Sequence, residues 1–216
     1  MRADGLEQPR WNPRNRRFRA TRYERLAKPC IDRGLSALLL IVLAPALLLA
    51  ALAIRVESRG PVFYVQSRIG RHGSRFGLIR FRTLAVRSEL WRRSLRSEPV
   101  AVPADSPDLT RIGRLLLNSR LDRLPMLINV YRGEMSLVGP RAALPYELEH
   151  YGPVDWIRLR VKPGVACLWQ LSGLPEADFR AAMALDQEYF NNQSLALDLQ
   201  IVLRTVVAIA GGKARH

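Results

Sequence analysis

Lysine, cysteine and histidine are all scarce in this chain of 216 residues. Its two cysteines, Cys30 and Cys167, form neither a disulfide framework nor a metal-ligand spacing. The three scattered histidines argue against a histidine-based metal site. Only three of the 34 basic residues are lysines, so arginine carries most of a net charge of +15. A GC-rich genome would explain the preference for arginine. The charge itself calls for an anionic partner: nucleic acid, a membrane surface or a phosphate-bearing substrate.

Residues 34–54 form an uncharged run of 21 residues in which Ser36 is the single polar side chain. About 20 apolar residues are enough to cross a bilayer as a helix. A signal peptide is an alternative, but the 33 residues before the run are too many for its basic segment. A buried core helix is a second alternative, although such helices usually carry polar residues on one face. A membrane helix is therefore the expectation.

Basic residues flank this run on both sides, nine between residues 10 and 33 and seven between residues 55 and 82. Basic flanks prefer the cytoplasmic side, so a straight crossing would leave one of them outside. Pro45 lies in the middle of the run, where it removes a backbone hydrogen bond and bends a helix. A re-entrant helix that enters and leaves on the cytoplasmic face resolves the conflict. A single straight span stays open as the alternative.

The expected fold class is α+β and mostly helical, with a re-entrant membrane helix and a cytosolic domain that contains a short β-hairpin. The expected divisions are a basic flexible arm (1–19), a membrane-associated segment (20–56), the cytosolic domain (57–210) and a tail (211–216). Strands are expected over 62–65 and 76–82, around a glycine-containing turn. Helices are expected over 21–33, 85–97, 111–118, about 122–132, 175–191 and 194–210, the last either in the core or at the membrane interface.

Basic side chains recur beside glycine-containing turns. Planar guanidinium groups bind phosphate oxygens in pairs, and glycine lets backbone N–H groups approach the same oxygens. The candidate phosphate-binding residues in these segments are Gln66, Arg68, Arg80, Arg82, Gly139, Arg141 and Lys162. Each arginine alone is more typical of a solvated surface. Together with a membrane segment, they indicate a polyanionic substrate near the bilayer.

Asp122 lies among the basic residues Arg114, Arg120, Arg123 and Arg132. One interpretation is an N-cap aspartate at the start of a helix. The other is a carboxylate nucleophile, kept ionised by the neighbouring cations, at a helix N-terminus that helps to hold phosphate. The two interpretations are compatible.

These residues together resemble the bacterial sugar transferases, the monotopic phosphoglycosyl transferases, over residues 34–205. The matching stretches are 60–70, 76–83, 110–114, 121–127, 129–141 and 162–164, with Asp186, Tyr189, Asp198 and Thr205 near the C-terminus. Ala44-Pro45 is similar to the Ser-Pro of the family's re-entrant helix. The resemblance implies a bacterial inner-membrane protein whose catalytic domain lies in the cytoplasm.

The activity that the resemblance implies is transfer of a sugar phosphate from a UDP-sugar to polyprenyl (undecaprenyl) phosphate, which initiates exopolysaccharide or other glycoconjugate assembly. Asp122 occupies the nucleophile position. It would attack the sugar-bearing phosphate, release UMP and form a phosphosugar–aspartate, which polyprenyl phosphate then attacks. Arg82 and Arg141 fall on phosphate-binding positions of the family.

One departure from the family pattern falls on the catalytic pair. The family's Ser-Leu-Asp-Glu is here Arg120-Leu121-Asp122-Arg123. The missing glutamate is tied in the family to Mg²⁺ and catalysis, so metal binding through position 123 is not expected and the metal requirement stays open. Arg123 either supplies part of the metal's charge or pairs with Asp122 and weakens it as a nucleophile.

The alternative function is therefore a catalytically impaired family member that acts as a non-enzymatic partner subunit in the same pathway. A homo-oligomer or a complex with a partner transferase is compatible with either function. Nucleic-acid binding is not expected, because the aromatic content is 7% and no known nucleic-acid motif is present.

Overall fold

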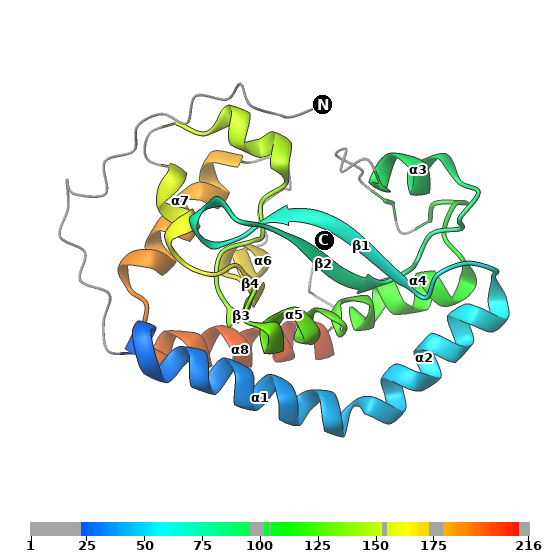
Figure 1. Cartoon of the computed structure of the whole chain (residues 1–216), viewed down its shortest axis with the longest axis horizontal. Helices are drawn as coiled ribbons and strands as arrows, with labels where there is room; N and C mark the ends of the chain where they lie inside the picture. The colour runs from blue at the N-terminus through cyan, green and yellow to red at the C-terminus, as the bar shows by residue number, and fades with distance from the viewer. Residues whose placement is uncertain (1–22, 96–101, 104, 153–154, 173–178, 212–216) are drawn as a thin grey trace.

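The computed structural model describes residues 23–95, 102–103, 105–152, 155–172 and 179–211 (Figure 1). This part of the chain is mostly helical, with an antiparallel hairpin and a second sheet of two parallel strands. The expected mostly helical α+β fold with a short hairpin is confirmed. The expected arm (1–19) and residues 212–216 of the tail lie outside the described residues, as do the ends of three expected helices (21–22, 96–97 and 175–178).

The membrane candidate is a bent pair of helices. A short π-helical turn, η1 (Tyr23–Ala27), leads into α1 (Lys28–Val42), and α2 (Ala44–Glu57) follows after Leu43. No single described helix is long and apolar enough to cross a membrane, but this pair, bent by 62°, meets both criteria together. Pro45 has no N–H to donate to the Ile41 carbonyl, so the hydrogen-bond ladder of α1 cannot continue. The expected bend thus lies directly beside Pro45.

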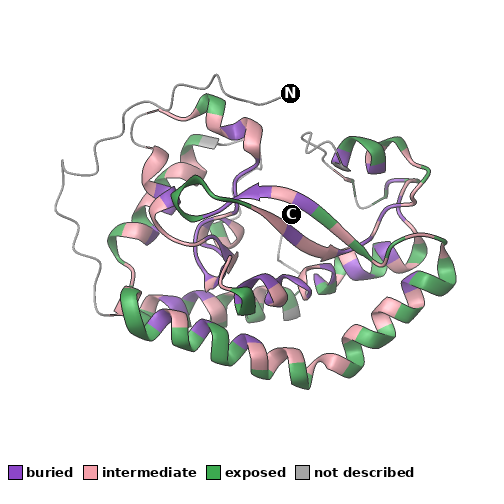
Figure 2. Ribbon diagram, viewed as in Figure 1, coloured by how far each residue is buried: buried purple, intermediate pink, exposed green. Residues whose placement is uncertain are grey.

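Both arms of this bent pair pack against the rest of the protein (Figures 1 and 2). On α1, the buried Asp32 carboxylate accepts a hydrogen bond of 3.1 Å from the Leu137 N–H. At the end of α2, Glu57 accepts hydrogen bonds from the N–H groups of Arg111 (2.6 Å) and Ile112 (2.9 Å) at the start of α4 (Arg111–Asn118). These bonds tie the apolar helices to two separate parts of the domain.

The hairpin consists of β1 (Phe63–Ile69) and β2 (Arg75–Phe81), joined by the 3₁₀ turn η2 (Arg71–Gly73). Tyr64 pairs with Arg80 and Gln66 pairs with Leu78 across the strands. The hairpin is confirmed, but β1 continues to Ile69, beyond the expected end at residue 65. The expectation followed the apolar residues at the start of the strand and stopped where polar ones begin. Polar side chains in the second half of β1 face an interior cavity instead of solvent, so the strand continues without an apolar pattern.

A second, parallel sheet pairs β3 (Ser136–Val138) with β4 (Gly164–Ala166), and α6 (Leu168–Ser172) follows β4. Neither strand was expected, and residues 160–164 were interpreted as a turn. Glycines let the two segments approach closely, since a Cβ on Gly139 would lie 2.4 Å from the Lys162 carbonyl oxygen, and one on Gly164 would lie 2.0 Å from the Gly139 nitrogen.

The helix expected from about residue 122 begins later. Residues Leu121–Arg123 form a 3₁₀ turn, η3, and α5 (Met126–Arg132) starts after Pro125. The interpretation of Asp122 as an N-cap is therefore wrong. A capping carboxylate accepts from the N–H two or three residues onward. Here the Leu124 N–H is bonded to the Leu121 carbonyl, and Pro125 has no N–H to give.

The remaining elements surround the two sheets. They are α3 (Glu89–Leu95), η4 (Pro145–His150), η5 (Asp155–Arg160), α7 (Phe179–Asn191) and α8 (Leu195–Ala210). One side of α8 packs on the parallel sheet, where Ile201 joins Val138, Ala166 and Tyr189 in a buried cluster. The other side exposes large apolar residues such as Leu203. The expectation that this helix belongs to the core is thus confirmed for one face, and the membrane interface stays a prediction for the other.

Candidate active site

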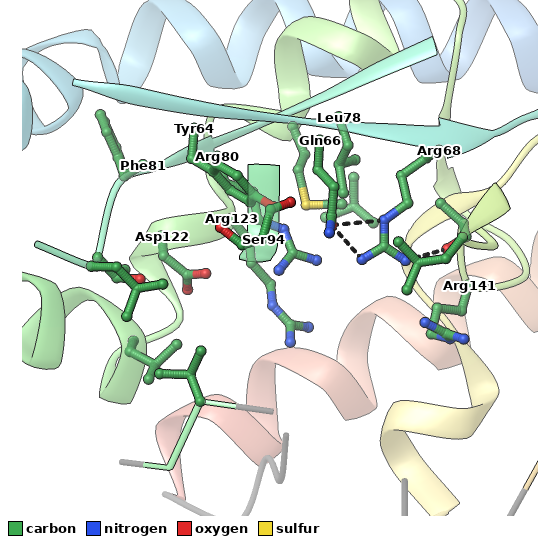
Figure 3. Close-up of a pocket in the computed structure, with 18 of the residues that line it drawn as sticks. Tyr64, Gln66, Arg68, Leu78, Arg80, Phe81, Ser94, Asp122, Arg123 and Arg141 are labelled. Atoms are coloured by element: carbon green, nitrogen blue, oxygen red, sulfur yellow. Dashed lines mark hydrogen bonds between the residues drawn. The ribbon is translucent and has the colours of Figure 1, made fainter. Parts of the chain in front are cut away.

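A cavity of about 430 Å³ lies between the hairpin, η3, α6 and the chain that follows β3 (Figure 3). Among the described residues that line it, one side chain is acidic and four are basic. These are Asp122 and the arginines Arg68, Arg80, Arg123 and Arg141. Figure 3 shows Asp122 on one side, Arg68 and Arg141 on the other, and the guanidinium groups of Arg80 and Arg123 between them. A pocket of this size and charge suits a compact polyanion.

Asp122 is held by the turn η3, which begins after Arg120, a residue in the left-handed conformation with φ of 61°. The side chain is buried, with 3% of its surface exposed, and its Oδ1 atom has no hydrogen-bond partner among the described residues. Burying a carboxylate oxygen without a partner costs free energy. The fold thus holds a carboxylate oxygen without a hydrogen bond in the wall of the cavity.

Arg80 and Arg123 lie close enough to Asp122 to shape its electrostatic surroundings. Burial and then repulsion from Arg123 lower the pKa of Arg80 to about 10, while Asp122 acts in the opposite direction. At this pKa Arg80 remains cationic at neutral pH. No ion pair joins Asp122 to either arginine within the part of the chain that the structure describes. Asp122 is therefore surrounded by positive charge without being neutralised by a direct contact.

Arg68 is fixed by its neighbours and points into the cavity. Its Nε and one terminal nitrogen donate to the Gln66 side-chain oxygen at 3.0 and 2.7 Å, and the other donates to the Ala142 carbonyl at 2.8 Å. Burial, with repulsion from Arg80 and Arg141, lowers the pKa of Arg68 to about 9. Since this value still lies above neutral pH, the side chain presents a rigid positive charge to an anionic ligand.

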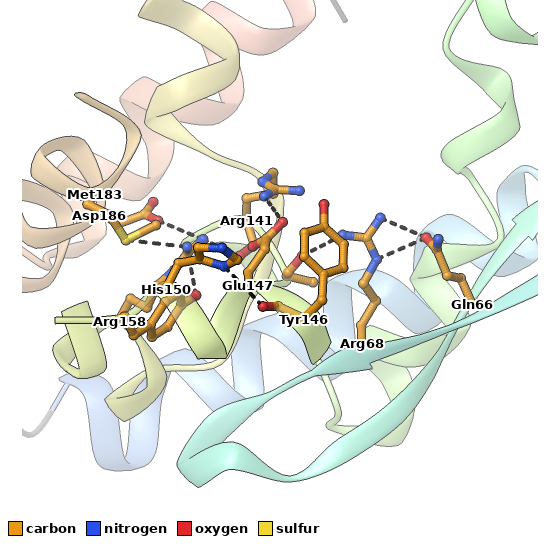
Figure 4. A network of polar contacts seen from close by, with 11 residues as sticks. Gln66, Arg68, Arg141, Tyr146, Glu147, His150, Arg158, Met183 and Asp186 are labelled. Atoms are coloured by element: carbon orange, nitrogen blue, oxygen red, sulfur yellow. Dashed lines mark hydrogen bonds and ion pairs between the residues drawn. The ribbon is translucent and has the colours of Figure 1, made fainter. Parts of the chain in front are cut away.

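Arg141 belongs to a network of buried charges behind the cavity (Figure 4). Its guanidinium pairs with the Glu147 carboxylate. Behind this pair, Arg158 donates to the Arg141 carbonyl at 2.7 Å and forms an ion pair of 2.9 Å with Asp186. Burial raises the pKa of Asp186 to about 6, so it remains mostly ionised at neutral pH. The network positions the backbone and the side chain of Arg141.

Removing one partner of the buried Arg158–Asp186 pair should destabilise the whole domain. The Asp186→Ala variant leaves the Arg158 guanidinium, which is 3% exposed, without its carboxylate. We expect the free energy of unfolding at pH 7 to fall by about 3–5 kcal/mol, measured by urea unfolding. The matched control is the double variant Arg158→Met/Asp186→Leu, which removes both charges and should recover most of that loss. Equal losses in both variants would contradict this explanation.

Three of the sequence-predicted residues lie away from the cavity. Arg82 is 1% exposed and donates to the Ser58 carbonyl and hydroxyl at 2.9 and 2.7 Å, which holds the chain where it leaves α2. The Gly139 N–H donates to the Ala166 carbonyl at 3.0 Å. Lys162 is half-buried, and burial and then the charge of Arg33 lower its pKa, which places it toward α1. Arg82 and Gly139 therefore make contacts that hold the backbone in place.

The sequence interpretation did not include the aromatic residues of the cavity. The rings of Tyr64 and Trp91 lie 5.4 Å apart, and Trp169 lines the cavity with a buried indole N–H that has no partner in the described part of the chain. Tyr64 carried a detectable signal, because it precedes Gln66 and Arg68 by two and four residues and so shares their face of β1. The two tryptophans lie far from these residues in the sequence, and no local pattern connects them.

The residues at the site include few protein ligands for a Mg²⁺ ion. Protein sites for this ion usually offer one or two carboxylates together with substrate phosphates. Across the described ranges, no group of three or more His, Cys, Asp or Glu side chains is placed to hold a metal. Asp122 is the one carboxylate among the described residues of the cavity lining, and its neighbour at position 123 is a cation.

The family model of the bacterial sugar transferases matches residues 23–212, so the chain belongs to this family. It is 35% identical over 193 residues to the exopolysaccharide production protein ExoY of Sinorhizobium fredii, which covers 85% of each chain. It is 38% identical over 194 residues to the UDP-glucose:undecaprenyl-phosphate glucose-1-phosphate transferase of Caulobacter vibrioides, covering 85% of this chain and 70% of the relative. The undecaprenyl-phosphate galactose phosphotransferase of Salmonella typhimurium is 34% identical over 200 residues, covering 88% of this chain and 42% of the relative. The family resemblance drawn from the sequence is confirmed.

Proposed function

We propose that this chain transfers a sugar phosphate from a UDP-sugar to polyprenyl phosphate, with Asp122 as the nucleophile. The observation that carries the proposal is a buried carboxylate oxygen without a partner in a cavity lined by four arginines. Membership of the bacterial sugar transferases supports the reaction class, and the names of the Caulobacter and Salmonella relatives support an undecaprenyl-phosphate acceptor. The product would begin an exopolysaccharide or a related glycoconjugate.

In the first step, the Asp122 carboxylate attacks the phosphorus that bears the sugar. The bond from this phosphorus to the bridging oxygen breaks, UMP leaves with that oxygen, and an acyl phosphate carrying the sugar remains on Asp122. In the second step, a phosphate oxygen of the acceptor attacks the same phosphorus. The bond to Asp122 breaks, which restores the carboxylate and releases a polyprenyl-diphosphate sugar.

The arginines supply positioning and charge in both steps. Phosphoryl transfer depends mainly on holding the reacting groups in line and on stabilising the charge that develops on oxygen. Arg80 and Arg123 lie between Asp122 and the opposite pair, Arg68 and Arg141, where they can hold the oxygens of the transferred phosphate. In an in-line displacement the leaving UMP develops charge on the side of the phosphorus away from Asp122, toward Arg68 and Arg141. We propose that Arg80 and Arg123 supply the positive charge that a divalent cation would otherwise bring, and no step passes through a metal.

The location that we propose is the inner face of a bacterial membrane, with the bent helix pair inserted as a re-entrant segment. The outer sides of α1 and α2 expose large apolar residues, including Ile41 at 73% and Leu48 at 70%. Contiguous exposed apolar surface of this kind favours lipid contact over water. The cavity and the arginines then lie on the cytoplasmic side, where nucleotide sugars are made.

The direct test is UMP release. The purified full-length protein, in micelles with undecaprenyl phosphate, is incubated with a panel of UDP-sugars, and UMP is measured. Without the acceptor, one donor should leave a phosphosugar adduct on the Asp122 peptide, detected by mass spectrometry. Absence of UMP with every donor, together with absence of the adduct, would overturn the proposal.

A second candidate function follows from the arginine at position 123, where the family has glutamate. The chain would then be an inactive partner subunit that supports an active transferase of the same pathway. This candidate predicts that Asp122→Asn complements a deletion strain for polysaccharide production and that the protein co-purifies with another transferase. Failure of that variant to complement would exclude it.

A further inference from the structure

A second cavity, of about 320 Å³, lies between α1 and α8 on the side of the domain where the bent helix pair packs. Its walls are two facing apolar stripes, Leu35, Leu39 and Leu43 on α1 and Val202, Val206 and Ile209 on α8. Spacings of three and four residues place each set along one side of its helix. We call this cavity the apolar groove.

The apolar groove adjoins the arginine-lined cavity. Arg123, Val165 and Gln170 line both of them, so the two spaces share part of their walls. Among the described residues that line the groove, the two charged ones are Arg120 and Arg123, which flank the Asp122 turn. The groove is therefore apolar along its walls and cationic where it meets the site.

A polar tie at one end sets the spacing of α1 and α8. Lys28 of α1 pairs with Asp198 of α8, and both side chains are buried. The hydroxyls of Tyr23 and Tyr189 lie 2.5 and 2.8 Å from the oxygens of the same carboxylate. The stripes follow this tie along both helices. The tie thus fixes the two walls of the groove relative to each other.

The exposed rim of the groove continues into the apolar surface that we assign to the membrane. Ile209 lines the groove and is 43% exposed, and Val207 beside it is 70% exposed. On the other wall, Leu43 joins α1 to α2 at the bend. A ligand in the groove can therefore extend from Arg123 to the bilayer without crossing a polar surface.

We propose that the apolar groove binds the first isoprene units of polyprenyl phosphate and directs its phosphate past Arg123 toward Asp122. This inference rests on the proposed function and adds a site for the acceptor. An anionic headgroup on an apolar chain matches an apolar channel that ends at guanidinium groups. A peptide segment does not, because its backbone N–H and C=O groups would find few partners among these walls. The donor then enters from the arginine-lined cavity and the acceptor from the groove.

Two tryptophan variants on α8 test the groove. Ala208 lines the groove and is half-buried, so Ala208→Trp fills it, whereas Leu203→Trp places the same side chain at an exposed position of α8 outside the lining. Adduct formation on Asp122, measured without acceptor, should stay within about twofold of wild type in both variants. Discharge of the adduct by undecaprenyl phosphate should slow at least about tenfold in Ala208→Trp alone. Equal discharge rates in the two variants would overturn the proposal.

A labelling experiment tests whether the groove binds a polyprenyl chain, and it does not depend on adduct formation. A polyprenyl phosphate with a photoreactive diazirine on its first isoprene units is irradiated with the full-length protein in micelles, and the labelled peptides are mapped. Label should appear on residues 35–43 and 202–209 and be displaced by undecaprenyl phosphate. Label elsewhere, or equal displacement by phosphatidylglycerol, would overturn the proposal. A missing Asp122 adduct would count against the proposed function alone.

Discussion

Replacing Asp122 with asparagine should reduce UMP release by about 10⁴- to 10⁶-fold and remove the phosphosugar adduct, because the amide oxygen is a poor nucleophile. Asparagine has nearly the same shape as aspartate, so the buried side chain should occupy the same space in η3. The measurement is single-turnover UMP release with the donor that gives the highest wild-type rate.

The control for this variant is its stability. Asp122 buries a carboxylate oxygen that has no partner, so replacing the charge should leave the melting temperature unchanged or raise it. A folded Asp122→Asn protein without turnover would assign the loss to the chemistry. A folded variant that releases UMP within tenfold of the wild-type rate would show that Asp122 is not the nucleophile.

Turnover of the wild-type protein should persist in excess EDTA, whereas Arg123→Ala should lose about 10²- to 10³-fold in kcat. The size of this loss is typical for removing one group that stabilises transition-state charge. The physical reason is the composition of the cavity lining, where Asp122 is accompanied by arginines and by no second carboxylate among the described residues. Steady-state kinetics with and without EDTA measure both effects.

Arg123→Glu provides the matched comparison, since it restores the acidic pair that the family carries at these positions. This variant should be inactive in EDTA and should recover part of its activity when Mg²⁺ is added, because two adjacent carboxylates can hold the ion. Arg123→Lys, which keeps the charge but loses the planar fork, should fall between wild type and Arg123→Ala. Loss of wild-type turnover in EDTA with full recovery in Mg²⁺ would contradict the arginine explanation.

Local sequence patterns predicted the elements whose signals lie within one segment. The hairpin followed from two apolar runs around a glycine turn, and α4 followed from helical spacing after Thr110, whose hydroxyl accepts from the Gly113 N–H at 2.8 Å. The bend beside Pro45 could be predicted because the missing N–H is a property of proline itself and depends on no distant contact. Asp122 was singled out by the basic residues that surround it in the sequence.

The remaining features depend on contacts between distant segments. The strands β3 and β4 have three residues each and lie far apart in the chain, so neither carries a period long enough to detect. Arg68 and Arg82 look alike in the sequence, yet one faces the cavity and the other holds the Ser58 carbonyl. Which arginine faces a ligand is decided by partners that local spacing does not reveal.

The hydrogen bonds of Asp32 and Glu57 have a consequence for the order of assembly during synthesis. The partners of these carboxylates are the backbone N–H groups of Leu137, Arg111 and Ile112, which leave the ribosome after the apolar helices are complete. At the membrane location proposed above, lipid would shelter the bent pair until its anchors have been translated. The rest of the chain would then close over a segment already in the bilayer, so that each newly made molecule would mature at the surface that holds the proposed polyprenyl substrate.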